Sequence, residues 1–361
     1  MEPEDNAPSA PAEGGPWNPD DIRITTKPYS LRHICDMISD GDLDLAPDFQ
    51  RRDVWKAPQK ARLIESILLR IPLPSFYFDE DVEGRLHVVD GVQRLTAIFE
   101  FARKSMKLSD LRYLESLDHK AYKELDPTLR RRFDGTQIFV NVIDPQTPPK
   151  VKFDVFVRLN TGGTPLNAQE IRHCISSNVS REFLKTCVSV AEFHAATGNA
   201  FRDKETTRMA DRELALRFFA LRQSDWEAVY RAKSSYDEFL VEMTQRIDGM
   251  NAQDLTPYVE SFTQAMKNAA LLFEGDAFRR WNRDGRKGPI NKSLFESWAV
   301  VLADVNWPSV AQRKDKILVE FKRRIAHDED YLASATVATT DLKRIQTRIR
   351  IAGEILDGSA P

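Results

Sequence analysis

A strand, a two-residue turn and a helix follow one another directly between residues 85 and 103, and no other stretch constrains the fold as strongly. It begins RLHVVDGVQRLTAIFE at Arg85. Leu86, Val88 and Val89 are typical of a buried strand, whereas residues 95–103 place their apolar side chains on one helical face. Gly91 permits the sharp turn between them, because glycine adopts backbone angles that other residues avoid. The stretch therefore predicts a helix that opens directly off the end of a strand.

The beginning of such a helix has the properties of an anion site. Its first N–H groups have no partner within the helix and carry the positive end of the dipole, so they can bind phosphate. Arg94 would add a planar fork of donors, and Gln93 would orient a water or donate to an oxygen. Asp90 would repel a bare phosphate, so it indicates either a bound metal ion or a cap for the turn. The alternative is an ordinary turn, with Asp90 as helix cap and Arg94 in a surface ion pair.

Short strands and helices alternate from about residue 22 to residue 144, and helical patterns dominate from about residue 150. The patterns predict helices over 31–39, 57–70, 95–103, 151–160, 168–175, 208–222 and 342–356, strands over 76–78, 86–89 and 136–143, and a hairpin through 81–84. We therefore predict an α+β fold that is predominantly helical, with a mixed α/β domain over 21–148 followed by a helical domain over 149–361.

Charge is unevenly distributed along the chain. The net charge is -3, but the first 21 residues hold six Asp or Glu and no Lys or Arg, which leaves +3 for the remainder. The tail 1–20 is also rich in Pro, Ala and Gly and poor in aliphatic residues, so we expect it to be disordered. A weakly basic body is compatible with an anionic ligand without requiring one.

Several classes of protein are disfavoured. The three cysteines, Cys35, Cys174 and Cys187, form neither a disulfide framework nor a CxxC metal motif, so we expect them to be small apolar fillers in a reducing compartment. No apolar run approaches the roughly 18 residues needed to span a bilayer, and no signal pattern opens the chain. We therefore expect a cytoplasmic protein without a membrane partner.

Four ordered blocks of sequence resemble one known family. The segment DGVQRL at Asp90 resembles the DGQQR signature of domain-of-unknown-function family 262, the N-terminal domain of GmrSD-type restriction proteins. The blocks FQRRDVW at Phe49, ARLIESILLRIPLP at Ala61 and FVRLNTGGTPLNAQEIR at Phe156 are similar to further blocks of that family in the same order, and RMADRELALRFF at Arg208 resembles a later helix. The resemblance covers roughly residues 25 to 225.

The resemblance implies a ParB/sulfiredoxin-like fold with a nucleotide site, because relatives bind or hydrolyse nucleoside triphosphates to control DNA cleavage. We predict that a nucleoside triphosphate with Mg²⁺ binds here; no metal ligand is assigned. Asp90, Gln93 and Arg94 are the predicted catalytic residues. The predicted nucleotide-binding residues are Gln50, Arg51, Gly91, Arg158, Asn160, Thr161, Gly162, Gly163, Glu170 and Arg172.

The sequence departs from the family pattern in two ways. Position 92 is Val where the family usually has Gln, which puts hydrolysis in doubt. Larger relatives also carry a C-terminal HNH nuclease domain, whereas only one of the six histidines here, His327, lies beyond residue 200. A His-metal nuclease centre is therefore not expected in the C-terminal half. The chain resembles a sensor without its nuclease, which implies DNA and a separately encoded nuclease or other defence protein as partners.

Each remaining candidate has a plainer interpretation. The Gly162–Gly163 loop forms an anion-binding nest or a flexible connector, and the segment 50–52 makes phosphate contacts or a solvated turn. Trp55 is a packing anchor rather than a base-stacking platform, and Glu170 with Arg172 faces the site or forms a surface pair. Basic residues at helical spacing around Arg344 and Arg348 form a solvated helix face in preference to a DNA-contacting one.

Three functions fit these observations. The first is a nucleotide-binding regulatory or sensor protein of a restriction or phage-defence system, with or without hydrolysis of the nucleotide. The second is a non-catalytic DNA- or protein-binding module of the same fold. The third is a ParB-like nuclease that nicks DNA at the same loop.

Overall fold

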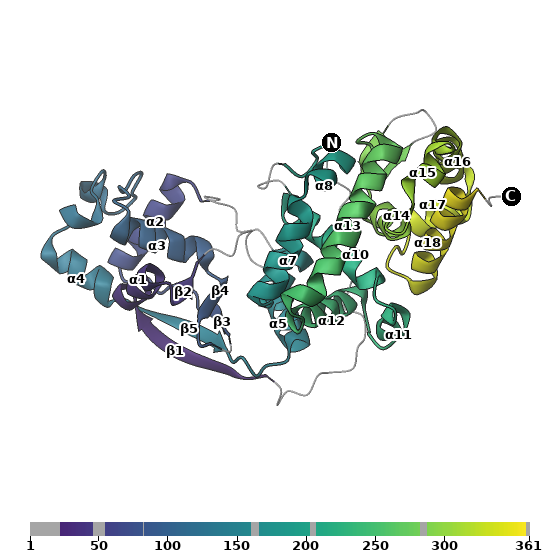
Figure 1. The fold of residues 1–361 in the computed structure, drawn as a ribbon. Coiled ribbons are helices and arrows are strands. Elements are labelled where there is room, and N and C mark those ends of the chain that lie inside the picture. The colour runs from purple at the N-terminus through teal and green to yellow at the C-terminus, as the bar shows by residue number, and fades with distance from the viewer. Residues whose placement is uncertain are drawn as a thin grey trace. The chain divides into compact units, whose positions relative to one another are not determined.

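The computed structural model describes residues 22–45, 55–81, 83–159, 166–202, 207–281 and 287–358. The predicted tail 1–20 and six predicted site residues lie outside this range, namely Gln50, Arg51, Asn160, Thr161, Gly162 and Gly163. The contacts divide the chain after Ile175 into a sheet unit and a helical unit (Figure 1). The predicted α+β class with a predominance of helix is confirmed.

The division by contacts falls later than the domain boundary predicted after residue 148. Helices α5 (Pro149–Leu159) and α6 (Ala168–Cys174) belong to the sheet unit. One reason is that Lys152 of α5 places its ammonium 2.6 Å from the Asp79 carboxylate of the sheet, with both side chains buried. Compact units and functional domains need not coincide, so the boundary after residue 148 stays a prediction about function.

The sheet unit is built on five strands in the order β1-β5-β3-β4-β2. Their bounds are β1 Ile24–Ser30, β2 Leu43–Asp44, β3 Phe76–Glu80, β4 Leu86–Asp90 and β5 Gln137–Ile143. The pairs β1–β5 and β3–β4 are antiparallel, and β3–β5 and β2–β4 are parallel. The predicted hairpin between β3 and β4 is confirmed. β4 therefore lies inside the sheet, with its carboxyl end at Asp90.

Helices cover one face of this sheet. They are α1 (Leu31–Asp40), α2 (Ala57–Leu68), α3 (Val92–Arg103) and α4 (Pro127–Gly135), and Figure 1 shows the first three beside the strands. Alternate residues of β5 contribute to the core that the helices share with the sheet, whereas Phe139 between them is 58% exposed. This alternation is the period of two that places successive side chains on opposite faces.

The predicted ends of the first helix are confirmed. The Ser30 hydroxyl accepts a hydrogen bond from the His33 amide at the N-terminus of α1, and Gly41 ends the helix with φ +85°. Strand β1 was not predicted: five of its seven residues are exposed and it contains Pro28, so it lacks the apolar alternation that identifies a half-buried strand. Pro28 is tolerated because β1 is an edge strand.

The described residues of the helical unit form helices and one small hairpin. The helices are α7 Asn178–Ser189, α8 Ala191–Ala196, α10 Ala210–Leu221, α11 Trp226–Arg231, α12 Tyr236–Asp248, α13 Ala252–Phe273, α14 Lys292–Leu302, α15 Trp307–Ala311, α16 Lys314–His327, α17 Glu329–Thr336 and α18 Leu342–Asp357. The hairpin joins β6 (Arg279–Trp281) to β7 (Lys287–Ile290). Sequence analysis described this half as helical and did not identify the hairpin.

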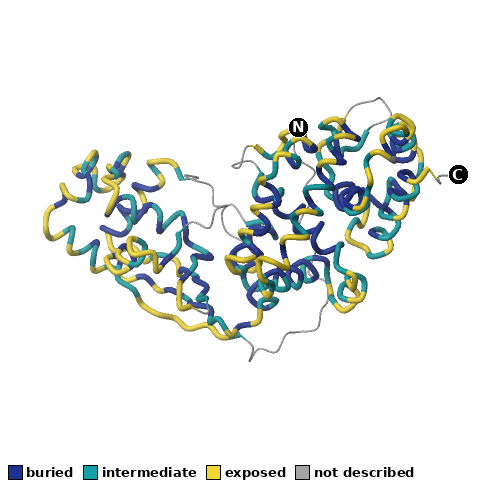
Figure 2. Tube along the Cα trace, viewed as in Figure 1, coloured by how far each residue is buried: buried dark blue, intermediate teal, exposed yellow. Residues whose placement is uncertain are grey.

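The core of the helical unit runs through α10, α13 and α14. Figure 2 shows these helices dark along their inner sides, and every residue of α10 from Arg212 to Leu221 is buried. Trp298 of α14 is fully buried, and its indole N–H donates to the Tyr331 hydroxyl at 2.9 Å. Burial of an unpaired charge in such a core is costly. We therefore expect the charged residues of this core to form ion pairs.

Two expectations about the chain as a whole can be compared with the structure. The three cysteines are free and buried, and burial raises the pKa of the Cys35 thiol to about 11, so their interpretation as fillers rather than reactive groups is supported. Within the described ranges, no helix has both the length and the apolar character needed to cross a membrane.

Candidate functional site

The corner between β4 and α3 is the strand–turn–helix that the sequence predicts. Gly91 has φ +101° and ψ 9°, and the helix begins at Val92, earlier than the predicted start at residue 95. The Leu95 amide donates to the Gly91 carbonyl at 2.9 Å. No described side chain caps this N-terminus. The alternative in which Asp90 caps the helix is therefore wrong, and the amides of residues 92–94 have no such partner among the residues that the structure describes.

Arg94 closes the corner from α3 back to the start of β3. One terminal nitrogen donates to the Pro74 carbonyl at 2.5 Å, and the other donates to the Ser75 carbonyl at 3.2 Å and to the Asp90 carboxylate at 2.9 Å. The guanidinium lies 4.1 Å from the centroid of the Phe76 ring. The Arg94 side chain is 13% exposed and that of Asp90 is 44% exposed.

These contacts make Arg94 a fixed, half-enclosed cation rather than one arm of a surface ion pair. Desolvation lowers the pKa of Arg94, and the Asp90 carboxylate opposes that shift; the guanidinium stays charged because arginine does not deprotonate in proteins. The guanidinium has five N–H groups and forms three hydrogen bonds with described residues, so two N–H groups have no partner among those residues and can donate to an anion. The more exposed Asp90 carboxylate is the member of the pair that a cation can reach.

Gly91 is required at this turn for two separate reasons. Its φ of +101° is disfavoured for residues with a side chain, and a Cβ there would lie 2.3 Å from Phe76 Cδ1 and 3.2 Å from the Arg94 guanidinium. The turn therefore brings the backbone directly onto the aromatic ring that supports Arg94.

Gly91→Ala is expected to lower the free energy of unfolding by more than about 2 kcal/mol, since it adds a clash to a strained backbone conformation. Gly84→Ala is the matched control: its φ is +81° and a Cβ there meets nothing within 4 Å, so only the backbone cost of about 1–2 kcal/mol applies. Urea unfolding monitored by circular dichroism measures both. Equal losses for the two variants would show that the close approach to Phe76 does not constrain the corner.

Gln93 connects the corner to the segment that precedes α2. The Trp55 amide donates to the Gln93 side-chain oxygen at 3.4 Å. Trp55 itself is half-buried and packs against the core of the sheet unit, which supports the prediction that it is a packing anchor. Because Trp55 ends the block that begins at Phe49, the structure brings two of the sequence blocks together at Gln93.

Val92 faces the core and not the loop. Its side chain is 8% exposed and belongs to the apolar cluster of the sheet unit. The departure from the family pattern at position 92 therefore changes packing in this chain, and it removes no polar group from the exposed side of the corner.

The predicted site residues after α5 divide into exposed and buried positions. Arg158 is exposed near the end of α5, whereas Glu170 and Arg172 of α6 are 3% and 1% exposed. Glu170 forms a capping box with Asn167: its carboxylate accepts from the Asn167 amide at 2.7 Å, and its own amide donates to the Asn167 side chain at 2.9 Å. The alternative of a surface pair at Glu170 and Arg172 is wrong, because both are interior residues. Their assignment to nucleotide binding remains a prediction.

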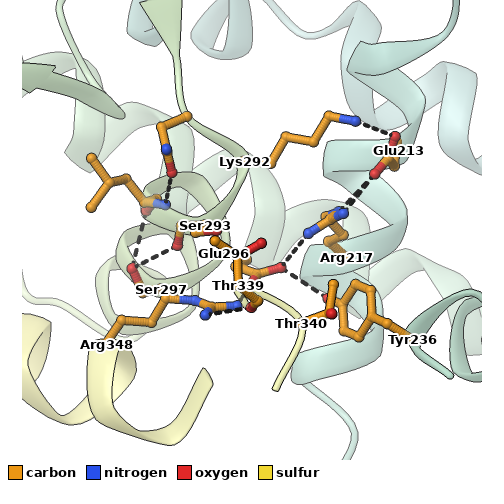
Figure 3. Close-up of polar contacts among 12 residues, drawn as sticks. Glu213, Arg217, Tyr236, Lys292, Ser293, Glu296, Ser297, Thr339, Thr340 and Arg348 are labelled. Carbon is orange, nitrogen blue, oxygen red and sulfur yellow. Dashed lines mark hydrogen bonds and ion pairs between the residues drawn. The ribbon is translucent and has the colours of Figure 1, made fainter. Parts of the chain in front are cut away.

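A second group of charged residues, which sequence analysis did not identify, is buried in the helical unit (Figure 3). The carboxylate of Glu296 on α14 is fully buried and accepts from Arg217 of α10 at 3.1 Å and from the Tyr236 hydroxyl of α12 at 2.9 Å. It also forms an ion pair with Arg348 of α18. Glu213 continues the chain of contacts, at 2.7 Å from Arg217. We call these five residues the Glu296 cluster.

Arg348 joins the C-terminal helices to this cluster. Its side chain is fully buried, and one terminal nitrogen donates to the carbonyls of Ser334 at 3.0 Å and Thr339 at 2.7 Å. Ile351 is also buried. The expectation of a solvated or DNA-contacting face through Arg348 is therefore wrong for that residue, because the buried stripe of α18 passes through it. The cluster is explained by charge pairing within a core.

Across the described parts of the chain, no three His, Cys, Asp or Glu side chains are grouped as metal ligands. A divalent cation at the corner would therefore depend on Asp90 together with oxygens of the ligand itself, which is the usual way in which Mg²⁺ binds with phosphates.

The sheet unit is thus an α+β domain whose most distinctive feature is a strand–helix corner with a half-enclosed arginine, where no side chain in the described ranges caps the helix. Residues 31–176 match the family model described as the N-terminal domain of the GmrSD restriction endonuclease. This match includes the corner and confirms the resemblance for that segment. No curated protein and no solved structure matched the chain, so the ParB-like comparison stays a prediction.

Proposed function

We propose that this chain is a nucleotide-responsive regulatory component of a restriction or phage-defence system, and that a nucleoside triphosphate with Mg²⁺ binds at the β4–α3 corner. The observation that carries the proposal is a helix N-terminus that no described side chain caps, together with the fixed cation Arg94. Both features favour negative charge at the same point. The similarity of residues 31–176 to a restriction endonuclease domain supports the choice of biological system.

In this proposal each residue of the corner has one role. The amides of residues 92–94 donate to phosphate oxygens, and the free N–H groups of Arg94 add charge-assisted hydrogen bonds. Gly91 keeps side chains away from the phosphates. Asp90, whose carboxylate is 44% exposed, faces a divalent cation that the phosphates also hold. Gln50, Arg51 and the Asn160–Gly163 loop are the proposed remaining contacts and lie outside the described residues.

Binding without turnover is the second candidate, and one observation favours it. Gln93, the residue expected to orient an attacking water, already accepts a hydrogen bond from the Trp55 amide. Its side chain is thereby tied to the wall of the corner. A bound nucleotide would then act by changing the affinity of the domain for a partner. The partners we propose are DNA and a separately encoded nuclease or other defence protein.

Calorimetric titration of the full chain with each common nucleoside triphosphate tests the proposal, with and without magnesium. We expect heat for at least one triphosphate and weaker binding without magnesium. The absence of heat with every triphosphate, at concentrations well above those of cells, would remove the nucleotide proposal. A phosphate-release assay on the same samples separates the two candidates, because binding with no release supports the non-hydrolysing protein.

A further inference from the structure

The helical unit concentrates positive charge in one part of the chain. Residues 276–327 contain twelve Lys or Arg and six Asp or Glu, a net charge of +6 in a protein whose total is -3. One of the six acids, Glu296, and one of the twelve cations, Arg324, are buried and paired, so neither adds to the surface charge. The elements concerned are the β6–β7 hairpin, α14, α15 and α16.

Two of these elements bring cations together around an aromatic ring. Trp281 of β6 is the cross-strand partner of Lys287 on β7, and α16 packs against β6. The ammonium of Lys322 on α16 lies 4.2 Å from the centroid of the Trp281 ring, and that of Lys287 lies 5.6 Å from it. We call Trp281, Lys287 and Lys322 the Trp281 cluster. Two like charges at one ring repel each other, and an anion between them would relieve that repulsion.

The outer side of α16 carries acids as well as cations: Asp315 and Glu320 line the same shallow surface as Lys316 and Val319. Glu320 is paired with Arg323 and Arg324. Lys316 and Lys322 are exposed, and no ion pair joins either of them to a carboxylate among the residues that the structure describes. Lys287 has one partner, Asp276, at 2.5 Å. Val319 lies between the two α16 lysines along the helix and is 67% exposed. The surface therefore combines unpaired ammonium groups with apolar and aromatic area.

We infer that the Trp281 cluster and the adjoining outer face of α16 dock the phosphate backbone of a nucleic-acid duplex. Regularly spaced phosphates attract a surface of dispersed lysines without requiring a shaped pocket. The choice of nucleic acid among polyanions rests on the proposed restriction-type function. The surface belongs to the helical unit, outside residues 31–176, and it does not include Arg348 of α18, which is buried.

Fluorescence anisotropy of a short labelled DNA duplex with the full chain, over a series of salt concentrations and without nucleotide, tests this inference. Wild-type affinity should fall linearly with salt on logarithmic axes. Replacing both lysines, Lys287→Gln with Lys322→Gln, should weaken binding at least tenfold at low salt and reduce the slope by about 2, since each phosphate contact contributes about 0.9. Lys123→Gln with Lys185→Gln changes the net charge equally at exposed sites elsewhere and should leave the slope unchanged.

Two further variants keep the test decisive. Lys322→Arg preserves the charge and should bind as wild type. Lys316→Glu alters an exposed residue and should fold normally even if the double variant does not, yet weaken binding. No binding at low salt, or equal losses for the double variant and its control, would overturn the inference. The two proposals can fail separately. Arg94→Ala should leave the affinity for the duplex unchanged, and the double lysine variant should leave the affinity for the nucleotide unchanged.

Discussion

Arg94→Ala is expected to weaken triphosphate binding by a factor of about ten to a hundred. A hydrogen bond to a charged group contributes about 1.5–3 kcal/mol, and about 1.4 kcal/mol corresponds to a factor of ten. The carbonyls of Pro74 and Ser75 and the Phe76 ring fix the position of the Arg94 guanidinium. Calorimetric titration of the variant with the triphosphate that wild type binds measures the loss.

Arg103→Ala is the matched control for that experiment. Arg103 lies in the last turn of the same helix, at the opposite end from the corner, and pairs with Asp36. Its substitution therefore removes the same charge without changing the proposed site. Arg94→Lys separates charge from geometry, because lysine lacks the planar fork and should recover only part of the affinity. Equal binding by Arg94→Ala and wild type would remove Arg94 from the site. Thermal midpoints without nucleotide identify any loss of folding.

Glu296→Gln is expected to lower the free energy of unfolding by about 3–5 kcal/mol, which is the cost of leaving a buried charge without its partner. The fully buried guanidinium of Arg348 and the buried one of Arg217 both face this carboxylate. Urea unfolding measures the change. Glu182→Gln is the control, since it breaks an exposed pair with Lys185 and should cost about 0–1 kcal/mol.

A compensating pair of substitutions tests the reason for that loss. Glu296→Leu combined with Arg348→Met removes both members of one buried pair and should recover much of the stability, because well-packed apolar side chains replace buried ions at little cost. If Glu296→Gln destabilised no more than Glu182→Gln, the cluster would not be holding α18 on the helical core. Nucleotide affinity should be unchanged in every folded variant of this series, since the cluster lies in the helical unit and the corner in the sheet unit.

Local signals made the corner and the first helix predictable from sequence. Ser30 and Gly41 cap α1 as expected, and the turn at Gly91 has the positive φ that glycine permits. In both places the residues that determine the conformation are neighbours in the chain. The predicted start of α3 was three residues late because Val92 was assigned to the loop, whereas it packs into the core as the first residue of the helix.

The remaining differences come from contacts between residues far apart in the sequence. Arg348 pairs with Glu296, which lies 52 residues earlier in the chain, and Lys152 likewise pairs with the distant Asp79. A helical pattern alone does not distinguish such a buried charge from a solvated one. The short strands of the β6–β7 hairpin have too few residues for an alternation to be recognised. Glu170 was identified by family resemblance, and its capping box with Asn167 also gives it a structural role. The spacing of Asn and Glu is itself a sequence signature of that cap.

A crystal structure of the full chain grown with a non-hydrolysable triphosphate and magnesium tests the central proposal most directly. We predict phosphate oxygens within hydrogen-bond distance of the amides of residues 92–94 and of the Arg94 guanidinium, with the cation between the phosphates and Asp90. A nucleotide bound at saturating concentration anywhere else in the chain, with the Arg94–Asp90 pair unchanged and the corner free of it, would contradict the proposal.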